Sequence, residues 1–340
     1  MATRVRGPAV AATLLGLLLL LAACGSGMAA GNGAPAVTRT VSPAALNPCL
    51  AQATSTPAAP VPVSASSAPT SDDLSALSDE FNDGSSLTSW TNLSTVEGWP
   101  NQVQKMDVSA TSPGTLYLVP YTSTWFEEYH GVFLFKEVTG DFMVTTHIRA
   151  NGKHSAVPTS AFSLSGIMAR APRDGLTPDS WTPGHENWVF ITTGVGHAVD
   201  GAPQIETKTT VNSVSDLRLI PSSTNWLDLR VVRVGQTFVM LYRLPGESWT
   251  LSRCFDRPDL PQRLQVGLNA YTDWDRINSQ YFNNEVAFNR TLLTGPDTHP
   301  DLIVRDDYVR FSRPPVPDVV KAQIASGALA LTAWLPFVTR

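Results

Sequence analysis

Beyond Leu74 the chain consists of short runs of β-branched and aromatic residues, and the runs are separated by Gly, Pro, Asn, Asp and Ser. This pattern is typical of β-strands joined by turns. Residues 141–149 show it most clearly: Phe142, Val144 and Ile148 alternate with side chains that would face the other way. The sequence therefore predicts an all-β domain with the architecture of a sandwich.

Further strands are expected at 163–169, 188–193, 204–211, 227–234, 237–244 and 264–271. Gly235 and Gln236 lie between two of these runs, and the pair predicts a tight hairpin turn. Residues 307–312 would form a last strand that returns beside Phe81. No parallel βαβ spacing and no glycine motif for phosphate binding interrupts this pattern.

Composition limits the possible partners. Charged residues make up 16% of the 340 residues, the formal net charge is -5, and no Lys/Arg cluster occurs. A nucleic-acid-binding protein normally shows a basic patch, so nucleic acid is not an expected partner.

The N-terminus resembles a bacterial lipoprotein signal. Arg4 and Arg6 precede an apolar stretch that is too short for a settled transmembrane helix, and Leu21-Ala22-Ala23-Cys24 follows as a lipobox. Cleavage before Cys24 and its lipidation would tether the protein to a membrane on the cell envelope or extracellular face. The alternative is an ordinary secretory signal, cut near Ala22 or at Ala29-Ala30.

Four segments are expected: a signal peptide at 1–23, a lipid-anchored linker at 24–74, a β-sandwich at 75–315 and a C-terminal tail at 316–340. The linker is rich in Ala, Pro, Ser and Thr, which cannot bury enough apolar surface to fold. In the tail, residues 319–331 are expected to form a short helix. The apolar segment 334–338 either packs against the sandwich or is a surface motif, and we favour packing.

The chain has three cysteines. With lipid on Cys24, Cys49 and Cys254 remain, and both would meet an oxidising compartment after export. A disulfide between Cys49 and Cys254 is one expectation, and two free thiols are the other.

The order of several motifs resembles that of concanavalin A-like jelly-roll domains, especially the LamG-like modules of bacterial exported proteins and of the C-terminus of some β-xylosidases. The resemblance covers roughly residues 77–314. The segments that carry it are Asp79-Glu80-Phe81-Asn82-Asp83, residues 131–142, Ser165-Gly166-Ile167-Met168-Ala169-Arg170, residues 226–233, Gly246-Glu247-Ser248-Trp249 and Val266-Gly267-Leu268-Asn269-Ala270.

This resemblance implies two antiparallel sheets, one of them curved, with ligands bound at the concave face or at the loops along one edge. It also implies that Trp90, Trp226 and Trp249 belong to the core. Family 16 glucanases share the fold but carry a Glu-x-Asp-x-x-Glu arrangement on one strand, which is absent here. Because one fold hosts both binding modules and enzymes, the resemblance leaves the activity open.

Sugar binding needs exposed aromatic rings beside groups that hydrogen-bond hydroxyls. Several segments offer this mixture. Alternation would place Arg170 on the same strand face as Met168, and Glu206 on the same face as Lys208 of a neighbouring strand. These faces would either line the concave sheet or form an exposed charge ladder. The predicted ligand-binding residues are Trp125, Tyr129, Arg170, Trp181, Glu186, Asn187, Glu206 and Trp274.

An enzyme would need two carboxyl groups across the scissile bond, and Glu186 with Glu206, or an Asp near Trp274, are the candidates for a glycoside hydrolase. No cofactor is required. A structural calcium ion is possible, with Asp79, Asp83, Asp273 and Asp275 as ligands. We therefore expect a cell-envelope lipoprotein that binds a glycan or polysaccharide. A hydrolase acting on extracellular polysaccharide and an adhesive or structural surface module are the alternatives.

Overall fold

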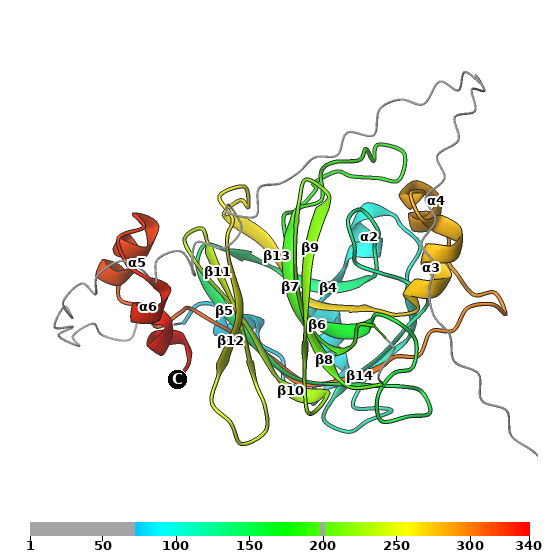
Figure 1. Ribbon diagram of the computed structural model, residues 1–340, viewed down its shortest axis with the longest axis horizontal. Helices are drawn as coiled ribbons and strands as arrows, with labels where there is room; N and C mark the ends of the chain where they lie inside the picture. Colours follow the sequence, from blue (N-terminus) through cyan, green and yellow to red (C-terminus); the bar gives the residue numbers. More distant parts are fainter. Residues whose placement is uncertain (1–71, 198–200) are drawn as a thin grey trace, which may run out of the picture. The chain divides into compact units, whose positions relative to one another are not determined.

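A computed structural model describes residues 72–197 and 201–340 of the chain. The expected sandwich of two antiparallel sheets is confirmed, and each sheet has seven strands (Figure 1). Sheet I has the order β1 (Thr91–Asn92), β4 (Val132–Thr139), β13 (Arg263–Tyr271), β6 (Ser163–Arg170), β7 (Trp188–Val195), β8 (Gln204–Val211) and β9 (Val214–Pro221). Sheet II has the order β12 (Thr250–Asp256), β11 (Thr237–Arg243), β10 (Trp226–Val234), β5 (Phe142–Asn151), β14 (Ile303–Ser312), β3 (Leu116–Pro120) and β2 (Val103–Val108).

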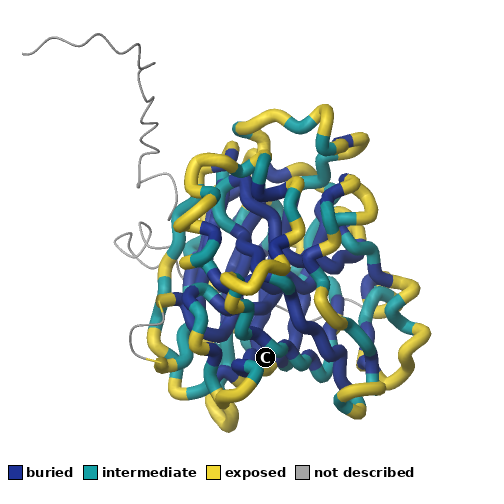
Figure 2. Tube along the Cα trace, turned by 90° about the vertical axis from the view of Figure 1, so that its right-hand side faces the viewer, coloured by how far each residue is buried: buried dark blue, intermediate teal, exposed yellow. Residues whose placement is uncertain are grey.

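The main hydrophobic core lies between the two sheets. Phe142, Val144 and Ile148 of β5 point into it, as their alternation predicts, and Val189 and Ile191 of β7 meet them from sheet I. Figure 2 shows the strands as a buried interior with exposed loops around them. The period-2 pattern therefore identifies the inward face of sheet II correctly.

The central strands of sheet I are buried on both faces. Every residue of β6 and β7 is buried, so these strands lack the alternation of a half-exposed strand. A second apolar cluster, which includes Trp125, Trp188 and Phe190, covers the face that points away from sheet II. We call this the covered face of sheet I.

Two glycines fix the close approach of strands in sheet I. A β-carbon on Gly166 would lie 2.1 Å from the carbonyl oxygen of Ile191, and one on Gly267 would lie 2.0 Å from that of Leu134. Any side chain at either position would displace the neighbouring strand, so glycine is needed here.

The outer face of sheet II is partly covered by the C-terminal helices α5 (Asp318–Ala325) and α6 (Leu331–Val338), which lie beside β11 and β12 in Figure 1. Trp334 and Val338 are each 1% exposed and pack with residues of β10 and β11, so the packing expected for this segment is confirmed. The single helix predicted at 319–331 is wrong. The chain turns at Gly327, whose φ of 69° favours glycine, and a second helix follows.

The predicted strands occur with small shifts in their ends, and Gly235 with Gln236 forms the predicted turn between β10 and β11. The last strand begins earlier, at Ile303, and Val309 bridges to Asp79 near Phe81. The sequence analysis did not predict β1, β2, β3, β4, β9 and β12 as strands, although residues 131–142, which contain β4, belong to the family resemblance. It also missed the short elements η3 (Ser75–Leu77), η4 (Gly84–Ser89), α2 (Leu93–Glu97), α3 (Trp274–Tyr281) and α4 (Glu285–Asn289).

Cys254, on β12, is disulfide-bonded. Cys24 and Cys49 lie outside the described residues, as do the signal peptide and most of the linker, so the pairing with Cys49 and the lipidation of Cys24 stay predictions. Within 72–197 and 201–340, no helix has both the length and the apolar character that a membrane crossing requires.

Candidate functional site

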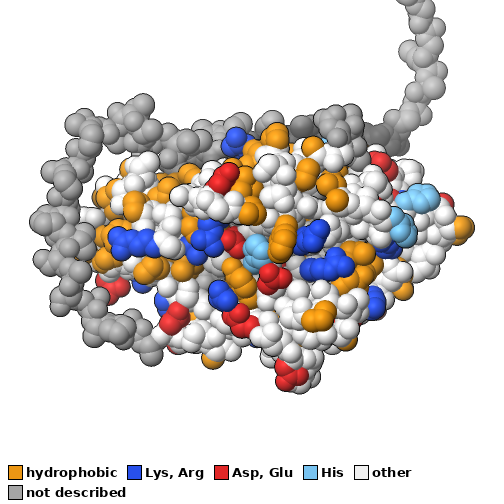
Figure 3. All heavy atoms as spheres, turned by 90° about the horizontal axis from the view of Figure 1, so that it is seen from below, with side chains coloured by type: hydrophobic (Ala, Val, Ile, Leu, Met, Phe, Trp, Pro, Cys, Tyr) orange, Lys and Arg blue, Asp and Glu red, His pale blue; other side chains and the backbone are white. Residues whose placement is uncertain are grey.

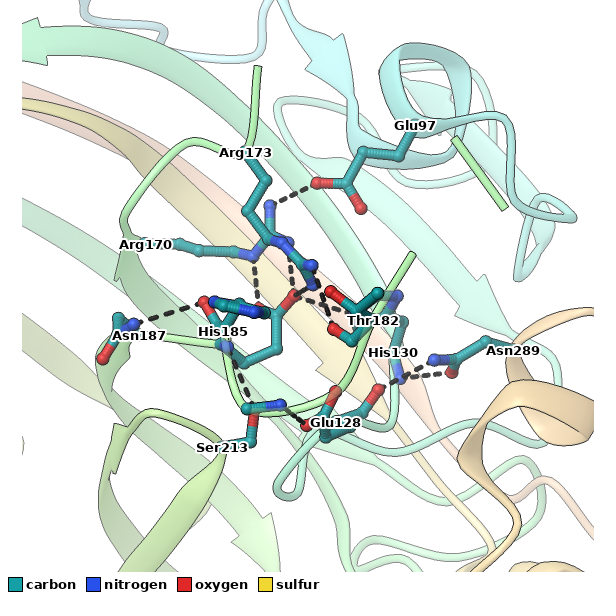
Figure 4. A network of polar contacts seen from close by, with 12 residues as sticks. Glu97, Glu128, His130, Arg170, Arg173, Thr182, His185, Asn187, Ser213 and Asn289 are labelled. Atoms are coloured by element: carbon teal, nitrogen blue, oxygen red, sulfur yellow. Dashed lines mark hydrogen bonds and ion pairs between the residues drawn. The ribbon is translucent and has the colours of Figure 1, made fainter. Parts of the chain in front are cut away.

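A network of buried charges lies at one end of the covered face (Figure 4). Arg170, the last residue of β6, binds Glu186 through two hydrogen bonds of 2.8 Å each and Glu97 of α2 through one of 2.6 Å. Arg173 adds a further contact of 3.0 Å to Glu186. All of Arg170, Glu186 and Glu97 are at most 1% exposed. The network thus joins sheet I, α2 and the β6–β7 loop (residues 171–187).

The charges of this network fix its protonation. Burial raises the pKa of Glu186, but the charge of Arg170 and a hydrogen bond from His130 outweigh burial and hold the pKa well below its usual range. Burial lowers the pKa of Arg170, but Glu186 and Glu97 reverse the effect and raise it. Glu186 is therefore an ionised carboxylate and not a general acid.

A second buried ion pair lies on the same face. Lys208 Nζ is 2.8 Å from Glu206 Oε1, and Tyr271 donates a hydrogen bond of 2.7 Å to Glu206 Oε2. Burial lowers the pKa of Lys208, while Glu206 opposes that shift. Glu206 is completely buried. Neither Glu186 nor Glu206, the predicted hydrolytic pair, is accessible to a substrate in this structure.

The strands do not place Glu206 and Arg170 as expected. β7 lies between β6 and β8, so the two faces predicted to be neighbours are one strand apart. The exposed charge ladder is also wrong, because Arg170, Glu206 and Lys208 are all buried. Both charge pairs instead fasten loops over sheet I, as when Lys208 donates to the carbonyl of Trp125.

The predicted aromatic residues divide into buried and partly exposed rings. Trp125 is fully buried and Tyr129 is 1% exposed, so neither presents a ring to solvent, contrary to expectation. Trp274 is partly exposed at the start of α3 but packs against Phe126 and Tyr129. Trp181 is partly exposed on the β6–β7 loop.

Asn187 ends the same loop and is half-buried. Its Oδ1 accepts a hydrogen bond of 2.8 Å from the backbone of Asn212, and Ser213 Oγ accepts one of 3.0 Å from the backbone N–H of Glu186. Glu186 therefore binds Arg170 and the turn between β8 and β9, while Asn187 binds only that turn and the backbone of its own loop.

The sequence analysis missed a small recess beside this network. It is formed by Trp99, Gln102, His130 and Asn289 with residues of α2, and it has a volume of about 10 Å³, enough for one water molecule. His130 Nε2 lies 3.3 Å from Glu186 Oε1, while His130 Nδ1 and Gln102 Oε1 are buried without hydrogen-bond partners. We call this the Trp99 recess. The ring of Trp181 lies 6.5 Å from that of Trp99.

The four aspartates predicted as calcium ligands do not form a metal site. Asp79 accepts hydrogen bonds from Trp90 and Phe81, and Asp83 caps η4. Asp273 accepts from Thr122 and His299, while Asp275 is exposed in the first turn of α3. The described part of the chain contains no group of three or more His, Cys, Asp or Glu side chains that would hold a metal ion.

Two tryptophans expected in the core lie on the outer face of sheet II. Trp90 is buried as predicted, but Trp226 is 44% exposed. Trp249 lies between the guanidinium groups of Arg230 and Arg243, at 4.0 and 4.8 Å. Trp226 is the cross-strand partner of Arg149 on β5. The sequence of β10 alone does not reveal this register.

Several solved structures are similar to this chain. A functionally unknown protein from Saccharomyces cerevisiae is 17% identical over 67% of this chain and 98% of its own, with a TM-score of 0.45. A β-glucanase from Bacillus licheniformis is 10% identical over 69% and 97%, with a TM-score of 0.39. The GH43 protein BlXynB mutant from Bacillus licheniformis is 11% identical, with a TM-score of 0.41, and this chain spans only 39% of it.

A comparison with curated proteins found no match. The family described as "Protein of unknown function (DUF1349)" matches residues 96–274, from the end of α2 to the start of α3. This match and the two seven-stranded sheets confirm the concanavalin A-like jelly-roll fold. Because the match covers more than half of the 340 residues, the chain belongs to the DUF1349 family.

Proposed function

We propose that this protein is exported, anchored to the cell envelope by lipid on Cys24, and binds glycans through its β-sandwich. The lipobox and the linker composition support the anchor. The disulfide at Cys254 supports export independently, because structural disulfides persist in oxidising compartments outside the cytoplasm.

The Trp99 recess is the observation that carries glycan binding. If His130 Nε2 donates to the ionised Glu186, Nδ1 is left as an acceptor, and Gln102 offers Oε1 as a second acceptor because its amide nitrogen faces the carbonyl of Thr291. Two buried acceptors without donors favour a ligand that brings hydroxyl groups.

Aromatic rings beside the recess suit a sugar. Trp99 is 6% exposed and packs edge-on against both His130 and Trp181. Trp181 presents part of its ring to solvent, and its indole N–H is buried without a partner. A sugar ring stacked on the exposed part of Trp181 would place a hydroxyl toward the recess.

A glycan-array screen of the full chain, with and without calcium and followed by product analysis on every hit, tests this proposal. We expect saturable binding without cleavage. Trp181→Ala should weaken binding about tenfold, or roughly 1.4 kcal/mol. His185→Ala is the matched control, because His185 is exposed on the same loop, whereas the ring of Trp181 packs against Trp99 of the recess.

Other results would overturn the proposal. Cleavage of a hit would indicate a hydrolase, despite the burial of Glu186 and Glu206. A blank array from folded protein would refute glycan binding and leave the adhesive or structural module as the working hypothesis. Equal losses in the Trp181 and His185 variants would place the site elsewhere.

A further inference from the structure

The uncovered part of the outer face of sheet II carries two arginines directly opposite each other. Arg149 of β5 pairs in register with Arg305 of β14, and Trp226 of β10 continues the row on the side of Arg149. Ile148 and Leu227 face the core, so their neighbours Arg149 and Trp226 face outward. Figure 3 shows basic and hydrophobic side chains mixed in a band on this side of the molecule.

This pairing is unusual because like charges opposite each other in antiparallel strands repel. Residues in adjacent strands are only about 5 Å apart at Cα. Other arginines of the sheet are neutralised: Arg310 binds Glu80 at 2.7 Å, and Arg243 binds Asp228 at 2.5 Å. Arg149 and Arg305 form no ion pair with any carboxylate of the described residues.

Aromatic rings hold both guanidinium groups in place. Arg149 lies 5.3 Å from the ring centroid of Trp226, and Arg305 lies 5.2 Å from that of Tyr117, the next residue in the row. The only hydrogen bond from Arg305 among the described side chains is a long one, 3.4 Å, to Asn151. The N–H edges of two positioned guanidiniums are therefore available to an anion.

We propose that Arg149 and Arg305 bind carboxylate groups of an acidic polysaccharide, with Trp226 as the platform for a neighbouring sugar ring. A guanidinium matches a carboxylate through two parallel hydrogen bonds, and Trp226 is the large aromatic side chain exposed here, at 44%. This site goes beyond the proposed function, since it lies on the other sheet from the Trp99 recess and takes a charged ligand.

The number of free cations favours a glycan over other polyanions. Tight binding to nucleic acid neutralises roughly 6–10 phosphates, and attraction to an anionic membrane takes clusters of about 4–8 basic residues. Two unpaired arginines on a chain of net charge -5 fall short of both. A polymer that carries one carboxylate on each sugar needs only a few such contacts.

The test is biolayer interferometry on the immobilised full chain, with polygalacturonate as the probe. Its fully methyl-esterified form, which carries no charge, is the control ligand. We expect binding to polygalacturonate alone, weakened by salt. Arg149→Gln and Arg305→Gln should each weaken it about tenfold, the loss of one charge-assisted contact. Trp226→Ala should weaken it several-fold.

Two variants serve as controls. Arg310→Gln removes an exposed arginine from the same face that is already paired with Glu80, so the affinity should not change. Arg263→Gln, on the other sheet and paired with Glu137 and Asp174, should also leave it unchanged. The urea midpoint of Arg149→Gln should equal or exceed that of the unaltered protein, because one of two opposed charges is gone.

The proposal is overturned if the esterified polymer binds equally well, or if the double variant Arg149→Gln/Arg305→Gln keeps the affinity. Absence of binding to polygalacturonate by the folded, unaltered chain also overturns it. Equal or tighter binding to vesicles of anionic lipid or to single-stranded DNA would replace the glycan with those partners.

Discussion

Replacing Arg170 by methionine tests whether the buried charge network fastens the loops over sheet I. Arg170 is completely buried, and its removal leaves Glu97 and Glu186, each 1% exposed, without their main positive partner. Breaking a buried ion pair from one side costs about 3–5 kcal/mol. Arg173 still contacts Glu186, so we expect a loss of about 4 kcal/mol at pH 7, near the middle of that range.

Urea unfolding followed by tryptophan fluorescence measures this loss, with an unchanged slope showing that the same surface is exposed. The control is Arg310→Met. Arg310 also binds a glutamate through two hydrogen bonds, but its side chain is 56% exposed, and such pairs contribute about 0–1 kcal/mol. If both variants lose equal stability, the buried network does not hold the loops.

The pH dependence gives a second check. The folded pKa of Glu186 is depressed, so its stabilising contribution is present above the unfolded pKa, about 4.3, and is lost as pH falls through the folded value. The stability difference between the unaltered protein and Arg170→Met should therefore narrow as pH falls below about 4.3. An apolar triple variant, Arg170→Met/Glu97→Leu/Glu186→Leu, should recover most of the loss.

Two further predictions concern sheet II. Burial, with a smaller effect of Asp307, raises the pKa of Asp306 well above its usual value. The free energy of unfolding therefore falls as pH rises from the unfolded pKa of this carboxyl group to its folded pKa. Asp306→Asn removes this pH dependence. In urea melts, the stability of the variant relative to the unaltered protein should rise by up to about 1.4 kcal/mol per pH unit above pH 4. A difference that does not change with pH would show that Asp306 is not protonated in the folded protein. Trp334→Ala should cost about 3–5 kcal/mol and release α5 and α6, seen as faster amide hydrogen exchange at 318–338 while β5 stays protected. Unchanged exchange there would refute the anchoring role.

Local sequence patterns identified four strands of sheet II and four of sheet I, namely β5, β10, β11 and β14, and β6, β7, β8 and β13. The alternation in β5 and the apolar runs of β6 and β7 are properties of neighbouring residues, so they are visible without a structure. β9 was not predicted because none of its residues is buried, so its two faces differ little in hydrophobicity. The helices α3 and α4 are too short to show a clear helical period.

The candidate site was harder to predict because side-chain exposure depends on what covers a strand. The chemical types of Arg170, Glu186 and Glu206 suggested ligand contacts, yet loops far away in sequence bury all three. The prediction for Trp226 was wrong in the opposite direction: a core position was expected, but the side chain is exposed. The C-terminal helices cover only part of the outer face on which it lies.

The sequence by itself determined the all-β class, the positions of most strands, the turn at Gly235 and the inward face of β5, because these follow from local periodicity and backbone preferences. Tertiary structure alone decided that the face of sheet I is covered, that His130 and Gln102 meet at a recess, and that Arg149 stands opposite Arg305. The physical reason is that the register between strands and the paths of long loops bring together residues that are far apart along the chain. A local sequence pattern contains no information about these long-range contacts.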